Sequence, residues 1–342
     1  MNPISTKMGA FYKNKKILVT GGTGSIGKQL VHQLLNYDPK QVIVYSRDDS
    51  KQYMMQCNYA HCENLHFSLG NIRDLQKLEY MTQGMDLIFH TAALKQVPIC
   101  ENNPFETINT NIIGSENVIK AAIKNQVKKV INISTDKAIN PMNILGATKL
   151  ISEKLFFKAN SMNNNKHTQF SSVRFGNVFG SRGSVVPLFI NQATSGNPIT
   201  VTDLDMTRFF MTIPQAVDLT LKAAFYSNGG ETFILKMDAI RIKDLAEVIQ
   251  SYYNGMNEKN LIPIKMTGIR PGEKIYEELL TEHEISKALE DDELFVLTND
   301  EGDFYHFKPA SINSYRSDQV PCINKEKISN LFLNFLKTHN KG

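Results

Sequence analysis

The fold of this chain is decided by one stretch of sequence, which reads Val19-Thr20-Gly21-Gly22-Thr23-Gly24-Ser25-Ile26-Gly27. The stretch joins an apolar strand expected at Lys16–Thr20 to an amphipathic helix expected at Gly24–Leu35. Its GxxGxxG spacing lets the backbone approach a pyrophosphate beside the positive end of the helix. Turns also use glycine, but a strand before the loop and a helix after it favour a dinucleotide site. We expect contacts from Gly21, Thr23, Gly24, Ser25, Ile26 and Gly27.

The end of the next expected strand indicates which dinucleotide binds. That strand, Gln41–Tyr45, continues as Ser46-Arg47-Asp48-Asp49-Ser50-Lys51. An acidic residue at such a tip holds the ribose 2′-hydroxyl of NAD, whereas Ser46, Arg47 and Lys51 suit the 2′-phosphate of NADP. We therefore expect NADP, while Asp48 leaves NAD open and a solvated polar turn is the plain alternative. Along the same sheet edge we expect cofactor contacts from Asn71, Ile72, Thr91 and Ala92.

Short apolar runs alternate with helical patterns through the first half of the chain. Further strands are expected at His66–Leu69, Asp86–His90, Val130–Ser134 and Gln169–Arg174, with a long helix over residues 104–125. Continuous apolar strands that alternate with helices predict an α/β fold, a Rossmann-type doubly wound parallel sheet covered on both faces.

After about residue 180, prolines separate shorter elements, and helices are expected at Ile213–Tyr226 and Ile242–Tyr253. This change predicts a smaller mixed α/β substrate-binding cap with a cleft between cap and sheet. We expect four parts: an N-terminal arm (1–15), a mainly NADP-binding domain (16–180), a mainly nucleotide-sugar-binding region (181–290) and a C-terminal extension (291–342).

The composition excludes several classes of protein. The 342 residues are 42% hydrophobic and 21% charged, which is a globular balance rather than that of a disordered chain, a collagen or a coiled coil. No apolar run reaches the roughly 18 residues of a membrane span, and the N-terminus lacks the apolar run of a secretory signal. The 38 basic and 34 acidic residues form no basic block, so no nucleic-acid partner is expected.

Four cysteines are present, Cys57, Cys62, Cys100 and Cys322, and they show no metal-ligand spacing. We expect reduced thiols, a cytoplasmic location and no metal.

The end of the expected strand Val130–Ser134 carries the candidate chemistry. It continues as Thr135-Asp136-Lys137, which brings a hydroxyl, a carboxylate and an ammonium to one strand tip facing the cofactor. Such a group suits acid–base catalysis. The alternative interpretation is a surface ion pair with helix-capping duties. Lys149 is expected to open a helix that ends at Phe157.

Nine motifs then occur in a fixed order between about residues 15 and 290: GGTGSIG, YSRDDSKQ, TAALKQVP, NTNIIGSENV, STDKAINP, GATKLISEKLF, RFGNVFGSRGSVVPLF, DMTRFFM and GIRPGEKIYEEL. On these motifs the chain resembles an extended short-chain dehydrogenase/reductase of the nucleotide-sugar 4,6-dehydratase group. It is most similar to the UDP-N-acetylglucosamine 4,6-dehydratases of the flagellin-glycosylation and capsule types.

The resemblance implies a redox-neutral elimination that makes a 4-keto-6-deoxy sugar. A hydride passes from sugar C4 to NADP+, a base removes the C5 proton, and the C6 hydroxyl leaves as water. The hydride then returns to C6 while C5 is reprotonated. Lys137 matches the family's base at C5, and Asp136 the acid at C6. Thr135 would bond near the 4-hydroxyl, and Lys149 would bind the nicotinamide ribose. Lys95 would lie between cofactor and sugar, and Thr110 would contact the cofactor.

One departure from the family pattern concerns the YxxxK tyrosine, whose position is taken by Leu145. No tyrosine occurs between Tyr80 and Tyr226. Thr135, Lys149, the substrate or water would then deprotonate the 4-hydroxyl, which is the interpretation we favour. The alternatives are a slow or inactive homologue, or a later tyrosine such as Tyr276 that folds into the site.

The resemblance also implies a nucleotide-sugar pocket. Arginine forks suit the oxygens of a diphosphate, and a glutamate can accept a ribose hydroxyl. The residues expected to bind substrate are Lys95, Thr135, Asn177, Ser184, Val185, Val186, Arg208, Arg270 and Glu273.

The expected partner is a nucleotide-diphosphate sugar, and relatives lead us to expect a homo-oligomer. UDP-N-acetylglucosamine is the favoured donor, with its GDP counterpart left open, and the product would enter bacterial surface-glycan or nonulosonic-acid biosynthesis. A nucleotide-sugar epimerase on the same scaffold, or a subunit that binds NADP without doing chemistry, are the competing hypotheses.

Overall fold

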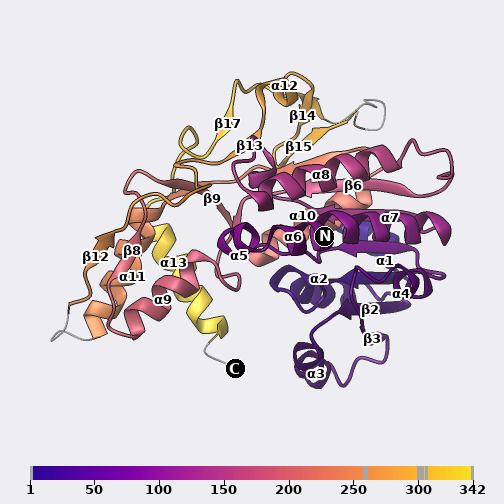
Figure 1. The fold of residues 1–342 in the computed structure, drawn as a ribbon, viewed down its shortest axis with the longest axis horizontal. Coiled ribbons are helices and arrows are strands. Elements are labelled where there is room, and N and C mark those ends of the chain that lie inside the picture. Colours follow the sequence, from indigo (N-terminus) through magenta and orange to yellow (C-terminus); the bar gives the residue numbers. More distant parts are fainter. Residues whose placement is uncertain (1–2, 257–260, 299–303, 305–306, 340–342) are drawn as a thin grey trace.

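A single large sheet runs through the molecule (Figure 1). The computed structural model describes residues 3–256, 261–298, 304 and 307–339. The strand order is β16-β14-β15-β10-β6-β5-β4-β1-β2-β3. Seven strands are parallel: β1 (Lys16–Thr20), β2 (Gln41–Ser46), β3 (Leu65–Leu69), β4 (Leu87–His90), β5 (Lys129–Ile133), β6 (Gln169–Arg174) and β10 (Thr232–Leu235). The order reverses between β1 and β4, so the expected Rossmann-type doubly wound fold is confirmed.

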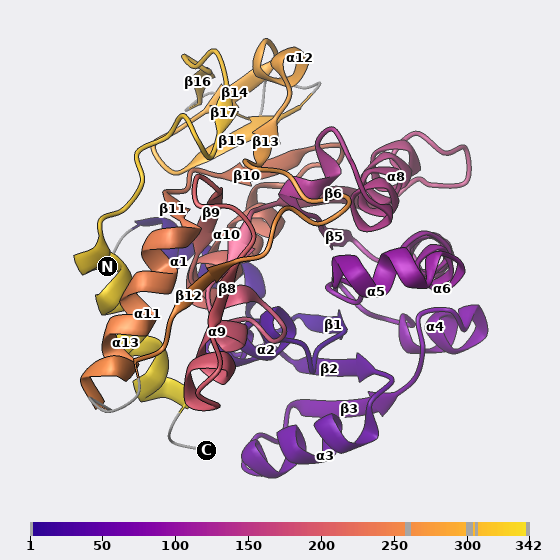
Figure 2. The same ribbon diagram turned by 60° about the vertical axis from the view of Figure 1, so that its left-hand side comes forward.

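Helices cover both faces of this sheet (Figure 2), which explains why β1, β2, β4 and β6 are buried along nearly their whole length. Ile17 and Val19 of β1 belong to one core, and Leu18 between them belongs to the core on the other face. The first face carries α1 (Pro3–Tyr12), α2 (Ser25–Leu35) and α10 (Ile213–Tyr226), and the second carries α4 (Leu75–Met81), α7 (Gly114–Lys124) and α8 (Ile144–Ala159).

Two helices differ in detail from the sequence expectation. The long helix over residues 104–125 is α6 (Pro104–Ile108), a π-helical turn at Asn109–Ile113, and α7. The helix expected to begin at Lys149 begins five residues earlier, at Ile144, because the Asn143 side chain caps it by accepting a hydrogen bond from the Gly146 N–H (2.8 Å).

The N-terminal residues pack on the sheet domain. In α1 the side chains of Met8 and Tyr12 are buried, and the Tyr12 hydroxyl donates to the Leu221 carbonyl of α10 (2.6 Å). Part of the expected N-terminal arm is therefore a helix that packs on α10, with the buried side chain of Tyr12 at the contact.

A smaller cap lies beyond the carboxyl ends of the parallel strands (Figure 1). It consists of α9 (Val185–Thr194), α11 (Ile242–Met256), the strand pair β8 (Ile199–Val201) and β12 (Ile264–Met266), and the sheet β7 (Asn177–Val178), β9 (Thr207–Met211) and β11 (Ala239–Arg241). Its apolar core includes Phe189, Ile199, Leu245 and Phe332. The expected mixed α/β cap is confirmed.

The C-terminal residues join both parts. The strands β15 (Leu294–Leu297), β14 (Ala288–Glu290) and β16 (Lys308–Pro309) extend the main sheet antiparallel from β10, and so cover an edge that would otherwise expose unpaired backbone groups. Strand β17 (Tyr315–Arg316) pairs with β13 (Glu278–Leu280), and α13 (Lys325–His339) packs on α11 of the cap. The boundaries expected at residues 180 and 290 stay a prediction.

Candidate active site

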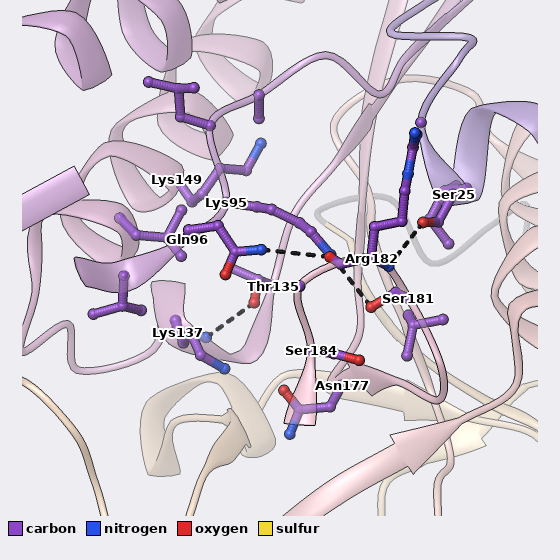
Figure 3. Close-up of a pocket in the computed structure, with 18 of the residues that line it drawn as sticks. Ser25, Lys95, Gln96, Thr135, Lys137, Lys149, Asn177, Ser181, Arg182 and Ser184 are labelled. Atoms are coloured by element: carbon purple, nitrogen blue, oxygen red, sulfur yellow. Dashed lines mark hydrogen bonds between the residues drawn. The ribbon is translucent and has the colours of Figure 1, made fainter. Parts of the chain in front are cut away.

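A cleft of about 1060 Å³ opens between the carboxyl ends of the parallel strands and the cap. Loops that follow β1, β2, β4, β5 and β6 form one wall, and residues 181–189 and 270–277 form much of the other. Figure 3 shows side chains from both walls around the same space. The topology makes this convergence, because parallel strands end at one edge of the sheet.

The glycine loop lies at one end of the cleft. Gly21 has a φ of +67° and its N–H donates to the Tyr45 carbonyl (2.8 Å). A Cβ atom on Gly27 would lie 2.5 Å from the Gly21 carbonyl oxygen, so only glycine lets helix α2 begin this close to β1. All six residues expected to contact the dinucleotide here line the cleft: Gly21, Thr23, Gly24, Ser25, Ile26 and Gly27. The loop therefore fits a diphosphate at the N-terminus of α2.

Basic side chains gather at the tip of β2. Arg47 and Lys51 line the cleft with Ser46. The carboxylate of Asp48 is occupied, because it caps α3 (Asp49–Asn58) by accepting from the Lys51 N–H (2.9 Å) and also pairs with the Lys51 ammonium. The hydrogen bond from Lys51 lowers the pKa of Asp48. The Asp48 carboxylate and the Lys51 ammonium are therefore engaged with each other.

Arg182 was missed by the sequence analysis. Its guanidinium donates to the Thr23 carbonyl, and its N–H donates to the Ser25 hydroxyl (3.2 Å), so the cap segment reaches over the glycine loop (Figure 3). Burial, then the charges of Arg182 and Lys51, lower the pKa of Lys28 on α2. Lys28, Lys51 and Arg182 are therefore close enough to one another at this end of the cleft for their charges to interact.

The middle of the cleft holds the remaining expected cofactor residues, Asn71, Ile72, Thr91, Ala92, Lys95 and Thr110. The Lys95 ammonium donates to the Ser181 hydroxyl (3.2 Å). Its pKa is lowered by burial and by the charges of Arg182 and Lys137. The Asn111 side chain, in the π-helical turn, bonds both the N–H and the carbonyl of Leu94, which fixes the segment that carries Lys95.

The tip of β5 places an ammonium between two carboxylates. The Lys137 Nζ lies 3.0 Å from Oδ1 of Asp136 and 3.3 Å from Oε1 of Glu277. Burial alone would lower the pKa of Lys137, but the two carboxylates raise it. Lys137 is therefore protonated in the resting structure, although the resemblance implied a base at this position.

Thr135 and Lys137 line the cleft, but Asp136 does not. Asp136 is fully buried behind them, where its Oδ1 accepts from the Thr135 hydroxyl (2.8 Å). Its Oδ2 has no hydrogen-bond partner among the described residues. In this arrangement Asp136 contacts Lys137 and Thr135. The resemblance implied that Asp136 touches the C6 hydroxyl directly, but its complete burial does not favour such a contact.

Helix α8 presents Leu145 and Lys149 to the same cleft. Lys149 is 5% exposed, and burial lowers its pKa to about 8 against the opposing charge of Glu153. Glu153 is itself held by the buried Arg174, whose Nε and Nη2 donate to its two oxygens at 3.1 and 2.7 Å. About half of the Lys149 side chains are thus neutral near pH 8.

The expected substrate residues fall into two groups. Asn177, Ser184, Val185, Arg208, Arg270 and Glu273 line the cleft, whereas Val186 is fully buried in the cap core. Val186 is turned inward because its helix must bury one face against α11.

Most of the N–H groups of the Arg208 guanidinium are already hydrogen-bonded within the protein, which leaves few of them to bind a diphosphate. Its guanidinium donates to the carbonyls of Thr207 (2.7 Å), Lys274 (2.6 Å) and Ile275 (3.0 Å). Arg208 therefore fixes the segment that contains Arg270 and Glu273. Arg208 itself also lines the cleft.

Glu277 is the second residue that sequence reasoning missed. It lies on an irregular segment, where neither helical nor strand periodicity marks an inward-facing position. The signal available was its place in GIRPGEKIYEEL, four residues after Glu273.

In the described parts of the chain, no helix is both long and apolar enough to pass through a bilayer. Over the same residues, no cluster of three or more His, Cys, Asp or Glu side chains is arranged to hold a metal ion.

Comparison with known proteins gives a consistent family. The family described as polysaccharide biosynthesis protein matches residues 17–299. The uncharacterized membrane protein MJ1061 of Methanocaldococcus jannaschii is 45% identical over 328 residues, which are 94% of this chain and 96% of that protein. The UDP-glucose 4-epimerase of Rickettsia rickettsii is 38% identical over 334 residues, with 94% and 96% covered.

Solved structures share the fold. Pen from Bacillus thuringiensis is 45% identical with a TM-score of 0.89, covering 95% of this chain and 98% of its own. The UDP-N-acetylglucosamine 4-epimerase from Methanobrevibacter ruminantium M1 is 25% identical with a TM-score of 0.65, covering 76% and 87%. The dTDP-glucose 4,6-dehydratase DesIV from Streptomyces venezuelae, solved with NAD and TYD, is 20% identical with a TM-score of 0.69, covering 76% and 86%, and supports the fold alone.

Proposed function

This chain belongs to the family of polysaccharide biosynthesis proteins, and from that premise we propose that it is an enzyme that converts a nucleotide sugar with NADP as cofactor. The proposed reaction is 4,6-dehydration of UDP-N-acetylglucosamine, or its GDP counterpart, to the 4-keto-6-deoxy sugar. We also propose that the protein is located in the cytoplasm and forms a homo-oligomer.

The observation that carries this proposal is the group formed by Thr135, Asp136, Lys137 and Glu277. A 4-epimerase needs acid–base help only at the 4-hydroxyl, where this fold commonly uses the tyrosine that Leu145 replaces here. A 4,6-dehydratase also needs proton transfer at C5 and at the C6 hydroxyl. Both reactions begin with loss of the 4-hydroxyl proton, so Leu145 does not separate them. The strand-tip group favours dehydration because it offers the additional acid–base groups that elimination needs.

The residues that would hold the dinucleotide are those of the glycine loop and of the β2 tip, together with Arg182. The fit is good because the loop leaves no room for a side chain at Gly27, and because Arg47 and Lys51 line the cleft at the tip of β2. When bound, the dinucleotide supplies a hydride acceptor and donor. Arg47 and Lys51 would pair with the 2′-phosphate of NADP.

The chain's own residues would divide the proton transfers. Lys149 is partly neutral near pH 8, so it can accept the proton of the 4-hydroxyl in place of the missing phenol. Thr135 would orient that hydroxyl. Lys137 remains our candidate for the C5 base, and it must lose its resting proton before it acts. The proton that it takes from C5 would then leave with the C6 hydroxyl as water, and the proton that Lys149 takes from the 4-hydroxyl would balance the one returned to C5.

A second candidate, UDP-sugar 4-epimerase, is favoured by the 38% identical Rickettsia relative of that name. One experiment separates the two: incubation with UDP- and GDP-linked N-acetylglucosamine and NADP, followed by NMR of the products. A 4-keto-6-deoxy sugar supports dehydration. A 4-epimer as the sole product would replace our proposal with the epimerase.

A further inference from the structure

Glu277 is a buried carboxylate to which the proposed proton transfers give no role of its own. The residue is 3% exposed, lines the cleft, and places its Oε1 3.3 Å from the Lys137 ammonium. Its Oε2 is buried and has no hydrogen-bond partner in the part of the chain that the structure describes. Leaving such an oxygen unpaired is costly, so the position is not explained by packing.

Among the described residues, charged side chains from four different segments lie around Lys137. Asp136 lies beside it at the β5 tip, and Glu277 approaches from the opposite wall. Two cations face the same space: Arg208 of β9, whose Nε is 3.7 Å from Glu277, and Lys95 of the segment after β4. The two carboxylates are nearest to Lys137, so they decide its charge.

The main chain of Glu277 is held by the C-terminal residues. Its N–H donates to the Ser317 hydroxyl (3.0 Å), and the Ser317 N–H donates back to the Glu277 carbonyl (2.9 Å). The Ser317 hydroxyl also lies 2.9 Å from that of Thr207, next to Arg208. A fully buried serine from beyond residue 290 thus fixes both Glu277 and the strand of Arg208.

We propose that Glu277 is a positioning residue for Lys137: with Asp136 it grips the ammonium from two sides, aims it into the cleft, and keeps its proton on until substrate enters. The catalytic consequence rests on the proposed function, because only a proton-transfer reaction needs this control. The electrostatic claim stands independently, since it concerns the protein without substrate.

The test is an NMR titration of the full chain with ¹³C-labelled lysine. The Lys137 signal is assigned by its loss in Lys137→Arg. In the wild type, that signal should stay at its protonated position through pH 9. In Glu277→Gln, the titration midpoint of Lys137 should fall by roughly one pH unit or more, because one of its two carboxylates is gone. Glu277→Met, a second neutral variant of similar size, should behave in the same way if the first does not fold.

The control is Glu282→Gln, which removes a carboxylate from an exposed position and should leave the Lys137 titration unchanged. An unchanged midpoint in a folded neutral variant at position 277 would overturn the inference. Turnover of UDP-N-acetylglucosamine by the wild type is measured beside it. If the wild type does not turn over substrate but the Lys137 midpoint shifts in the Glu277 variant, only the proposed function is refuted. If the wild type turns over substrate normally but the Lys137 midpoint does not move in the variant, only the role of Glu277 is refuted.

Discussion

Leu145 and Lys149 lie one helical turn apart on α8, and both face the cleft. The leucine occupies the place where this fold commonly carries an acid–base tyrosine, and the lysine has a pKa lowered by burial to about 8. In the proposed reaction, this pair would let the site work without a phenol, because Lys149 would serve as the proton acceptor at the 4-hydroxyl.

The first prediction follows from Lys149. Its neutral fraction increases as the pH passes about 8, so kcat should rise across pH 7–9. Lys149→Arg holds a permanent charge and should lower kcat by at least about 100-fold at every pH. Steady-state rates against pH check this, with Lys154→Arg, exposed on the same helix, as the control. A flat profile, or an active Arg variant, would contradict the role of Lys149.

The second prediction concerns Lys137. Lys137→Ala should lower turnover by about 10²–10⁴-fold while leaving NADP binding nearly intact, because the lysine lies at the β5 tip away from the glycine loop. Turnover and NADP titration of the same preparation measure the two effects. Lys166→Ala, in an exposed loop, is the matched control. Normal turnover in Lys137→Ala would refute its part in catalysis.

The third prediction concerns cofactor choice. Arg47→Ala should weaken NADP binding roughly tenfold or more and change NAD binding much less, since a charge-assisted bond to the 2′-phosphate is lost. Calorimetric titration with both dinucleotides provides the comparison within one variant. Equal losses for both would mean that Arg47 does not face the ribose.

The fourth prediction gives the C-terminal residues a structural role. Ser317→Ala leaves the buried N–H of Glu277 without its hydrogen-bond acceptor. The substitution should lower the unfolding free energy by about 1–3 kcal/mol. Chemical denaturation measures the change, with the exposed Ser286→Ala as control. An unfolding free energy equal to that of the wild type would show that Ser317 does not hold Glu277.

Much of the fold could be predicted because local chemistry decides it. Apolar runs such as Ile17 to Val19 are buried on both faces, and the glycine spacing marks the first turn. The start of α8 was misplaced because Asn143 acts through a cap, which depends on backbone geometry rather than on periodicity.

The candidate site was less predictable where contacts join distant segments. Glu277 and Ser317 meet Lys137 and Thr207 only after the chain has crossed from sheet to cap. Asp136 was expected to face the substrate, and its complete burial follows from tertiary packing that no spacing reveals. Residue type and motif indicated the chemistry, and the long-range contacts determine which side chain reaches the cleft.

The most direct test of the proposed reaction uses UDP-N-acetylglucosamine that carries deuterium at C4. With NADP and the wild-type protein, a dehydratase moves that deuterium to C6, and NMR of the product should show a singly deuterated 6-methyl group beside a 4-keto carbon. Deuterium that stays at C4, in a 4-epimer that retains its C6 hydroxyl, would contradict the account.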